Sequence, residues 1–423
     1  MSTTGTGRTN GATGTSGTCG AKAHRGATPR PVGQTTDVVV IGSGLVGACC
    51  AYELTLAGLN VTIVDRGHLT SGTTASGEGN ILISDKAPGA ELELAKLSLT
   101  RWTELADELE ADIEYDPKGG VVVATGEAEA DGLRHFAAQQ REVGVTAVEV
   151  SGDRLRELEP HLAPDLATGI HYPQDAQVQP VLAAAVLLQQ ARQRGATVVP
   201  EAEVTAIGVD RTGRVASVTT TRGSFATRWV VNAAGPWSGE ISALAGLHLP
   251  LAPRRGHILV TEPCEPLIHH KVYDAGYVGT LTADAQPDAV EVSSVVESTR
   301  AGTILLGSSR EFVGYDRRID GEVVRAIAER ATRLFPVLAG VRLMRAYVGF
   351  RPWLPDHLPA IGETLAVPGF VQASGHEGAG IGLSPATGRL VRDLITGHEP
   401  PIDPTPFRPD RPTLQNDAEV AHG

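Results

Sequence analysis

The chain has 423 residues, of which 41% are hydrophobic and 20% are charged, so it is long enough to bury two hydrophobic cores. Its formal net charge of −13 argues against nucleic acid or an anionic membrane surface as a partner. No run of about 18 apolar residues is present, so no transmembrane helix is expected. The four cysteines lack the spacing of a metal site or a disulfide framework, which suits a cytoplasmic protein without bound metal.

The two ends of the chain differ from its middle. Residues 1–35 are mostly Gly, Thr and Ser, with almost no large apolar side chains, so they cannot bury enough surface to offset the entropy of ordering. We expect a disordered tail there, without the apolar stretch of a secretory signal. Residues 399–423 are rich in Pro and Asp, and we expect them to form an extended tail over the surface.

Strand and helix patterns alternate along the rest of the chain. A fully apolar run at residues 38–41 predicts a buried parallel strand, a helix follows over 45–57, and a second strand follows over 61–64. Further helices are predicted at residues 90–110, 128–142, 154–160 and 181–194.

Later segments indicate sheet. Residues 195–235 read as a strand, a hairpin turned by DRTGR, and another strand that leads into glycine. The stretches 256–263, 289–299 and 303–309 indicate an antiparallel sheet. A parallel βαβ unit followed by an antiparallel sheet predicts an α/β fold with an α+β second domain, the two domains interleaved in sequence.

Gly42, Gly44 and Gly47 form a G-x-G-x-x-G motif between the first strand and the first helix. The first glycine permits a tight turn, the second lets a pyrophosphate approach the backbone, and the third allows the helix to pack closely on the strand. Asp65 ends the next strand, 18 residues after Gly47, where an acid binds ribose hydroxyls. NAD and FAD share this pattern, so the motif alone leaves the choice between them open.

Four distant segments bear on that choice. Residues 71–80 (SGTTASGEGN) and 230–238 (VVNAAGPWS) are rich in small residues, which permits close approach to a flat ring. Residues 349–363 (GFRPWLPDHLPAIGE) precede a strand, a glycine-rich turn and a long helix at 369–397. In this order, the motifs resemble those of the FAD-dependent D-amino-acid oxidase superfamily. This group includes glycine and sarcosine oxidases and the flavin subunits of hydroxyproline and opine dehydrogenases.

The resemblance covers residues 36–410 and implies a Rossmann-like FAD-binding domain interleaved with a substrate domain on an antiparallel sheet. The FAD-binding domain would comprise residues 36–85, 165–240 and 345–398, and the substrate domain 86–164 and 241–344. Family members with covalent flavin use a cysteine near the C-terminal motifs or a histidine in the early loop. Neither is present here, so we expect noncovalent FAD.

The resemblance also implies roles for single residues. The residues expected to bind FAD are Gly42, Ser43, Gly44, Gly47, Asp65 and Arg66 at the ADP portion, Thr73, Thr74, Ser76 and Gly77 along the diphosphate and flavin, Val204 near the adenine, Ala234 and Gly235 close to the cofactor, and Gly378, Gly380, Ile381, Gly382 and Leu383 at the flavin. The last group would place backbone N–H groups and a helix dipole where negative charge develops on flavin reduction.

Arg351 is the expected catalytic-site residue for the substrate, because the arginine of the RP motif is similar to the one that pairs with the amino-acid carboxylate in this superfamily. A planar, permanently charged guanidinium suits that task. The alternative for Arg351 is an interdomain salt bridge. His376 lies in the family's SGHEGAG segment and has either an acid/base role near the flavin or a backbone-positioning role.

For several other residues, both a role in the site and a structural role are considered. Glu78 and Asn80 follow the flavin loop and could meet the substrate amine. Asp356 and His257 are interpreted as structural, and the pair 269–270 as surface histidines. Four aromatic residues could line the substrate pocket or belong to the core: Tyr273, Tyr277, Tyr347 and Trp353.

The expected activity is oxidation of the C–N bond of a small amino or imino acid, of the D-amino acid, glycine, sarcosine or hydroxyproline type, by hydride transfer to flavin N5. Oxygen, a quinone or partner subunits would accept the electrons, and the loop at residues 76–95 leans toward flavin subunits of heteromeric complexes. Two alternatives are a flavin-bearing subunit with an electron-relay or structural role, and an NAD-dependent opine-type dehydrogenase. The position of Arg351 discriminates the first, since an arginine facing an open pocket favours catalysis.

Overall fold

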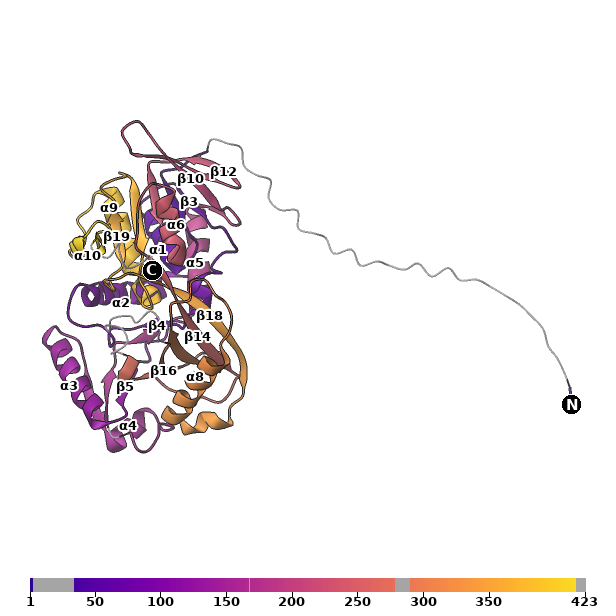
Figure 1. The fold of residues 1–423 in the computed structure, drawn as a ribbon, viewed down its shortest axis with the longest axis vertical. Coiled ribbons are helices and arrows are strands. Elements are labelled where there is room, and N and C mark those ends of the chain that lie inside the picture. The colour runs from indigo at the N-terminus through magenta and orange to yellow at the C-terminus, as the bar shows by residue number, and fades with distance from the viewer. Residues whose placement is uncertain (3–33, 167, 278–289, 416–423) are drawn as a thin grey trace.

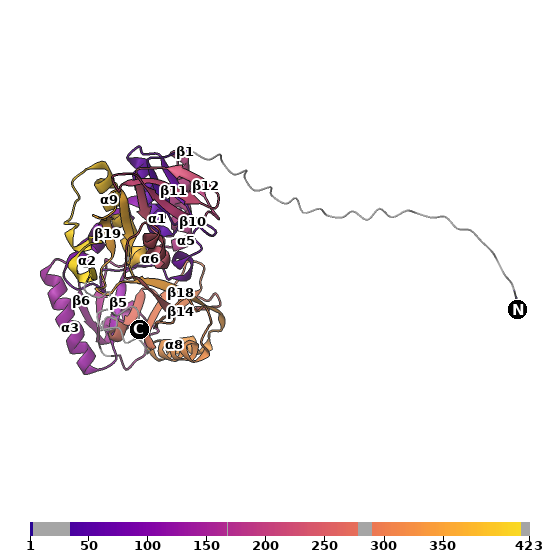
Figure 2. The same ribbon diagram turned by 45° about the horizontal axis from the view of Figure 1, so that its top comes forward.

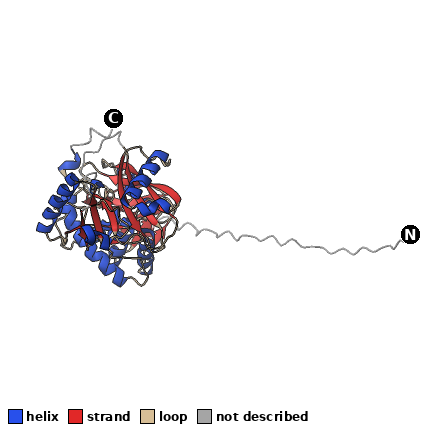
Figure 3. Ribbon diagram, turned by 90° about the horizontal axis from the view of Figure 1, so that it is seen from below, coloured by secondary structure: helices blue, strands red, loops and turns tan. Residues whose placement is uncertain are grey.

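The computed structural model describes residues 1–2, 34–166, 168–277 and 290–415. The predicted N-terminal tail therefore lies almost wholly outside the described residues. Figure 1 shows two packed halves, one containing α1, α5, α9 and β3 and the other containing β5, β14, β16 and α8. Figure 2 shows α3 and α8 at the end of the molecule away from α1 and α9, and Figure 3 shows strands at the centre with helices around them.

The first half is built on a six-stranded sheet. Its strands, in spatial order, are β19 (Ala360–Glu363), β20 (Phe370–Ser374), β13 (Trp229–Asn232), β2 (Val38–Ile41), β3 (Val61–Val64) and β9 (Thr197–Val199). All neighbours are parallel except β19, which runs antiparallel to β20. Every residue of β2 and β3 is buried, as expected of strands covered on both faces.

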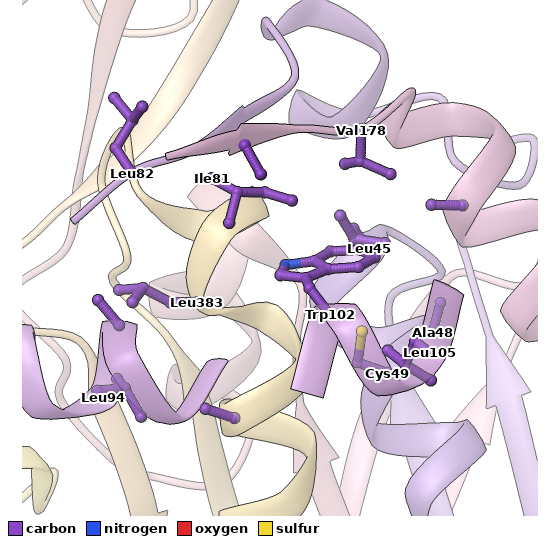
Figure 4. Packing of buried hydrophobic residues seen from close by; sticks show 14 of the residues in the cluster. Leu45, Ala48, Cys49, Ile81, Leu82, Leu94, Trp102, Leu105, Val178 and Leu383 are labelled. Atoms are coloured by element: carbon purple, nitrogen blue, oxygen red, sulfur yellow. The ribbon is translucent and has the colours of Figure 1, made fainter. Parts of the chain in front are cut away.

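Three helices pack beside this sheet: α1 (Leu45–Leu56), α5 (Pro180–Gln193) and α9 (Gly380–Thr396). Helices α1 and α9 approach closely because Gly388 has no side chain; a Cβ there would lie 2.8 Å from the Cys49 carbonyl. Figure 4 shows Cys49 of α1 in the core with Trp102 and Leu105 of α2 (Ala90–Glu108). Burial raises the pKa of the Cys49 thiol to about 12, which leaves it an inert apolar group.

The second half is built on an eight-stranded sheet. Its strands, in spatial order, are β18 (Leu343–Trp353), β14 (Ala252–Thr261), β17 (Ile304–Arg310), β16 (Glu291–Ser298), β15 (Lys271–Asp274), β5 (Gly120–Ala124), β7 (Thr168–Tyr172) and β6 (Val148–Ser151). The expected antiparallel arrangement holds except between β15 and β5, which are parallel. The helices of this half are α3 (Glu127–Glu142), α4 (Gly152–Leu158) and α8 (Gly321–Leu334).

Two smaller sheets and several short helices complete the described fold. The four-stranded sheet contains β1 (Gln34–Thr35), β12 (Gly223–Ala226), β11 (Val215–Thr220) and β10 (Val204–Val209), and the two-stranded sheet contains β4 (Asn80–Ile81) and β8 (Ala176–Gln177). Strands β10 and β11 form the predicted DRTGR hairpin. The short helices are η1 (Thr73–Ser76), η2 (Gly235–Trp237), α6 (Ser238–Ala243), η3 (Pro336–Gly340), η4 (Thr405–Phe407) and α10 (Pro412–Gln415). None of the described helices is long and apolar enough to span a membrane.

Strand membership differs from the expected segments at two places. Strands β7 and β18 lie in the eight-stranded sheet, although the sequence placed nearly all of their residues in the FAD-binding segments 165–240 and 345–398. Local apolar pattern does not show which sheet a strand joins, because either sheet can bury it. The two segments therefore pass between the halves, and β18 carries Arg351 into the second sheet.

The C-terminal segment is packed, not merely extended over the surface. Phe407 is fully buried and Leu414 is 3% exposed. The Arg411 guanidinium donates to both carboxylate oxygens of Asp356, at 2.6 and 2.8 Å, and to the Leu358 and Pro359 carbonyls. This ion pair holds the pKa of Asp356 below its usual range despite burial. Asp356 is thus structural, as expected, and its partner is in the predicted tail.

Replacing Arg411 by alanine tests this anchor. Removing one partner leaves the Asp356 carboxylate partly buried without its counter-ion, so we expect the free energy of unfolding to fall by about 3 kcal/mol. Urea denaturation at pH 7 measures it. The matched control is Arg408→Ala, whose exposed pair with Asp410 contributes little, so its urea midpoint should stay that of the wild type. Equal midpoints for the two variants would contradict the anchoring role of Arg411.

Candidate functional site

A cavity of about 470 Å³ lies between the two large sheets. On one side it is lined by residues at or just after the carboxyl ends of four parallel strands, including Gly42, Asp65, Ala234 and Ser374. On the other side, strands β14, β17 and β18 contribute Gly256, Ser308 and the segment 349–352. Ligands of open α/β sheets bind at this edge of the sheet, since the loops there diverge.

The glycine motif shapes one end of the cavity. Gly42 has a φ of +105°, and a Cβ on it would overlap the Ala233 carbonyl oxygen. A Cβ on Gly47 would overlap the Gly42 carbonyl, so this glycine lets α1 start directly against the strand. Gly44 is the residue before α1, and it has no side chain to cap that helix start. Gly42 and Gly44 line the cavity, whereas Gly47 lies behind them.

Asp65 is held rigidly at the end of β3. Its Oδ2 accepts from the Ser43 N–H at 2.7 Å and from the Ser43 hydroxyl at 2.6 Å, and its Oδ1 accepts from the Gly67 N–H at 2.9 Å. The carboxylate lines the cavity, while Ser43 is fully buried and reaches it only through Asp65. This geometry fits an acid that presents its remaining lone pairs to ribose hydroxyls.

The next predicted residues follow the cavity. Thr73, Thr74, Ser76 and Gly77 all line it, and the Thr74 hydroxyl accepts from the first N–H of α1, that of Leu45, at 2.9 Å. Val204 also lines it. Arg66 also lines it and stacks on Trp237, 3.9 Å from the ring centroid. Ala234 and Gly235 complete this wall.

A second helix begins at the cavity. Helix α9 has no side-chain cap at its start, and Gly378, Gly380 and Ile381 line the cavity there. Gly382 and Leu383 do not line it: a Cβ on Gly382 would lie 3.3 Å from the Asn80 carbonyl oxygen, and Leu383 is 1% exposed in the core. The cavity therefore has two helix starts whose N-cap residues supply no capping side chain, and a glycine cradle; this donor set fits the phosphates and the electron-accepting ring edge of FAD.

Arg351 lines the cavity from β18 in the eight-stranded sheet, whereas Val204 lines it from β10 in the four-stranded sheet. Its Nη1 donates to the Ser309 carbonyl at 2.8 Å, and within the described ranges it forms no ion pair with a carboxylate. The interdomain salt bridge considered from the sequence is thus not formed by these residues. Burial, with the Arg310 guanidinium nearby, lowers the pKa of Arg351 to about 10, so it stays charged near pH 7.

The sequence analysis missed the residue that makes room for Arg351. The guanidinium crosses β14 at Gly256, where a Cβ would overlap Nη1 and lie 2.8 Å from the Ser309 carbonyl oxygen. Gly256 belongs to the RRG segment at the start of a strand, and that glycine was the available signal. Because Gly256 has no side chain, Arg351 on the edge strand β18 can extend across the neighbouring strand β14.

A buried charge cluster borders the same part of the cavity. Glu78 lines the cavity and its Oε2 accepts from Asn80 at 2.9 Å and from the Lys271 ammonium at 3.2 Å. Lys271 also donates to Glu297 at 2.8 Å. Sequence reasoning found Glu78 and Asn80 but neither Lys271 nor Glu297, because these come from β15 and β16, about 200 residues further along the chain.

The remaining candidate residues divide into those that lie at the cavity and those that have a structural position. Tyr277 lines the cavity, and the Tyr347 hydroxyl lies 3.4 Å from the Gly77 carbonyl beside it. Tyr273 is fully buried and bonds Ser84, and Trp353 packs edge-on against Phe312. His257 is buried between Ser309 and the Asp320 N–H, which makes it structural. His269 is exposed, as expected, but His270 is partly buried, with its Nδ1 2.9 Å from Glu159 Oε1. No group of side chains that could hold a metal ion occurs among the described residues.

Comparison with known proteins agrees with this site. Residues 37–394 match the family described as FAD dependent oxidoreductase. The chain is 30% identical over 380 residues to a glycine oxidase of Geobacillus kaustophilus, covering 88% of this chain and 96% of that one. It is 29% identical to hydrogen cyanide synthase subunit HcnC of Pseudomonas aeruginosa, covering 88% and 95%. The crystal structure of the Geobacillus kaustophilus glycine oxidase superposes with a TM-score of 0.81 at 29% identity, covering 89% of this chain and 99% of that one.

The noncovalent attachment of FAD and the role of each lining residue stay predictions. The resemblance drawn from the motifs is confirmed, and so is the interleaved α/β architecture. With a cavity lined by Asp65, by Arg351 and by the starts of α1 and α9, this chain belongs to the FAD-dependent oxidoreductase family of D-amino-acid oxidase type, and it is an enzyme.

Proposed function

We propose that this enzyme oxidises the C–N bond of a small amino or imino acid whose carboxylate binds Arg351. The observation that carries the proposal is the partly buried Arg351 guanidinium, which faces the FAD cavity without a carboxylate partner among the described residues. A buried cation is costly unless an anion compensates it, so the site is suited to an anionic substrate group. Relatives named glycine oxidase and sarcosine dehydrogenase act on such molecules.

The proposed roles at the cofactor follow the geometry. Asp65 would bind the ribose, the turn at Gly42 and Gly44 the diphosphate, and the start of α9 the flavin ring. FAD supplies an acceptor for the hydride that leaves the substrate Cα. The protein's task is then to fix the substrate by its carboxylate, exclude water and keep its nitrogen in the reactive state. The rival role as an electron-relay subunit has less support, because such a subunit needs no anion-binding arginine in its cofactor cavity.

His376 is proposed to position the backbone, not to transfer protons. Its Nε2 lies 2.9 Å from the Thr387 hydroxyl, which itself donates to the Leu383 carbonyl at 2.9 Å. The hydroxyl oxygen must therefore accept from an Nε2–H. Burial lowers the pKa of His376 to about 4, so the ring is neutral at pH 7. The ring thereby ties the turn before α9 to the second turn of that helix.

The electron acceptor is proposed to be oxygen, a quinone or partner subunits. HcnC, a relative at 29% identity, is by its name a subunit of a larger enzyme, which supports a heteromeric complex as one form of this chain. A cytoplasmic location, expected from the cysteine content, is likewise part of the proposal.

The substrate class can be tested by anaerobic mixing of the FAD-loaded enzyme with glycine, sarcosine, D-alanine, proline and hydroxyproline. We expect at least one of them to bleach the flavin absorbance, since each has an amine next to a carboxylate. Reoxidation by air-saturated buffer is then compared with reoxidation by a soluble quinone. If all five amino acids leave the flavin oxidised while the dye-reduced enzyme still reoxidises, the proposed substrate class is wrong.

Gly256→Ala tests the position of Arg351. The added methyl displaces the guanidinium, and a misplacement of about 1 Å can cost on the order of 100-fold in kcat/KM. We expect most of this loss in KM, with FAD content unchanged, and a similar loss for Arg351→Lys, which cannot bind a carboxylate bidentately. The control is Gly132→Ala in α3, where a Cβ meets nothing within 4 Å. A KM for Gly256→Ala equal to that of the wild type would contradict the role of Gly256 in making room for the Arg351 guanidinium.

His376→Gln tests the neutral state of the histidine. Between pH 4 and about 6.5 the unfolded chain binds a proton at His376 and the folded chain does not, so wild-type stability falls as the pH falls through this range. The His376→Gln variant has no titratable group at this position, so its stability does not fall for this reason. We expect the wild-type stability advantage to be constant above pH 7 and to shrink by about 3 kcal/mol at most toward pH 4. Urea unfolding with excess FAD at each pH measures it; a pH-independent difference would mean that folding does not lower the pKa of His376.

A further inference from the structure

We propose that Glu78 is the second half of the substrate clamp: its unpartnered carboxylate oxygen binds the substrate nitrogen and accepts the proton of the substrate ammonium. The assignment rests on the proposed function, because it requires an amino or imino acid on Arg351. It concerns a residue for which the sequence motifs fix no role.

The first support is the unequal use of the two Glu78 oxygens. Oε2 accepts from Asn80 and Lys271, whereas Oε1 is buried without a hydrogen-bond partner in the described part of the chain. Glu78 is 8% exposed and lines the cavity. A buried carboxylate oxygen without a donor is costly, and such oxygens are satisfied when a ligand brings the missing donor.

The second support is the charge balance of the cluster. Two carboxylates, Glu78 and Glu297, share the single ammonium of Lys271, and all three groups are buried. The other titratable groups that face Glu78 are the phenols of Tyr277 and Tyr347. One negative charge is therefore left over on the side of the cluster that faces the cavity. A substrate ammonium would complete it, as the carboxylate of the same molecule completes Arg351.

The third support is that both charged groups lie against the same strand. Glu78 Oε1 lies over Gly307 of β17, where an added Cβ would be only 2.6 Å from it. Arg351 donates to the carbonyl of Ser309, two residues further along that strand. The carboxylate and the guanidinium therefore reach the cavity from neighbouring points of β17, as the two ends of one small zwitterion require.

The chemistry needs such an acceptor. An amino acid at pH 7 carries its nitrogen as ammonium, which has no lone pair to form the C=N bond. Transfer of one N–H proton to Glu78 Oε1 frees that lone pair, and the Cα–H then leaves as hydride to the FAD of the proposed function. Burial raises the pKa of Glu78 above its ordinary value, which brings it closer to that of an amine and makes it a better base.

The experiment uses the full-length, FAD-loaded enzyme and the Glu78→Gln variant, which keeps the shape of the side chain without its charge. Anaerobic flavin reduction by the member of the glycine, sarcosine and proline set that reduces the wild type fastest is followed from pH 7 to 9.5. We expect the variant to be about 100-fold slower at pH 7. The wild-type to variant ratio should shrink as the pH approaches the pKa of the substrate amine, because that substrate arrives already neutral.

Binding of nitrogen-free acids separates this role from a structural one. Acetate and tetrahydrofuran-2-carboxylate contact Arg351 but bring no ammonium, so Glu78→Gln should bind them as the wild type does, or more tightly. Glu78→Asp retains the carboxylate on a side chain shorter by one methylene, and it should recover part of the rate with the wild-type pH dependence. A ratio that does not change with pH, or equally weakened binding of both acids, would overturn the role of Glu78. A wild type that no amino acid reduces would instead overturn the proposed function.

Discussion

The structure depends on one steric constraint, the close approach of backbone to backbone where β2 turns into α1. Gly42 lies against the Ala233 carbonyl and Gly47 against the Gly42 carbonyl, at distances that admit no side chain. This contact brings the start of α1 directly over the carboxyl ends of β2 and β13. The same principle recurs at Gly388, which lets α9 pack on α1, so both helix starts point into one cavity. A methyl group at either place would separate the elements whose ends form the cofactor site.

The eight-stranded sheet contributes charged side chains to the cavity, whereas the glycines beside the six-stranded sheet leave room for a ligand. Strands β14 to β17 are largely buried, and charged side chains in such a place are stable only when paired. Arg254 is paired with Glu291 and Glu377, and Arg255 with Glu311. Burial opposes ionisation of Glu377, yet the charges around it hold its pKa at about 2. Against this background of compensated charge, Arg351 lines the cavity without a carboxylate partner among the described residues, and Glu78 Oε1 and Asn80 Oδ1 are buried there without a hydrogen-bond donor from them.

A feature can be predicted from the sequence when the residues that form it lie close together along the chain. The βαβ unit and its acid lie within 30 residues, so spacing alone identifies them, and the predicted helices match the observed ones within about two residues. Lys271 and Glu297 were missed because their meeting with Glu78 depends on the order of β15, β16 and β17 in a sheet that local pattern does not encode. The packing of the C-terminal segment was missed for the same reason, since Arg411 and Asp356 are 55 residues apart. The role of Gly256 in making room for Arg351 can be recognised only when the pairing of β14 with β18, and its register, are known.

The pocket's selectivity follows from the cost of leaving either charge unmatched. A site that holds a buried hydrogen-bonding group discriminates strongly against ligands that fail to satisfy it, whereas an apolar wall discriminates only weakly. A plain carboxylic acid satisfies Arg351 and leaves Glu78 without a donor; a plain amine does the reverse. A zwitterion compensates both charges at once and adds no net charge to the buried site. The same two groups then act in sequence, because the arginine keeps its ion pair while the glutamate gives up its own when it takes the proton. The substrate thus loses the charge that helped it bind at the point where that charge would block the reaction.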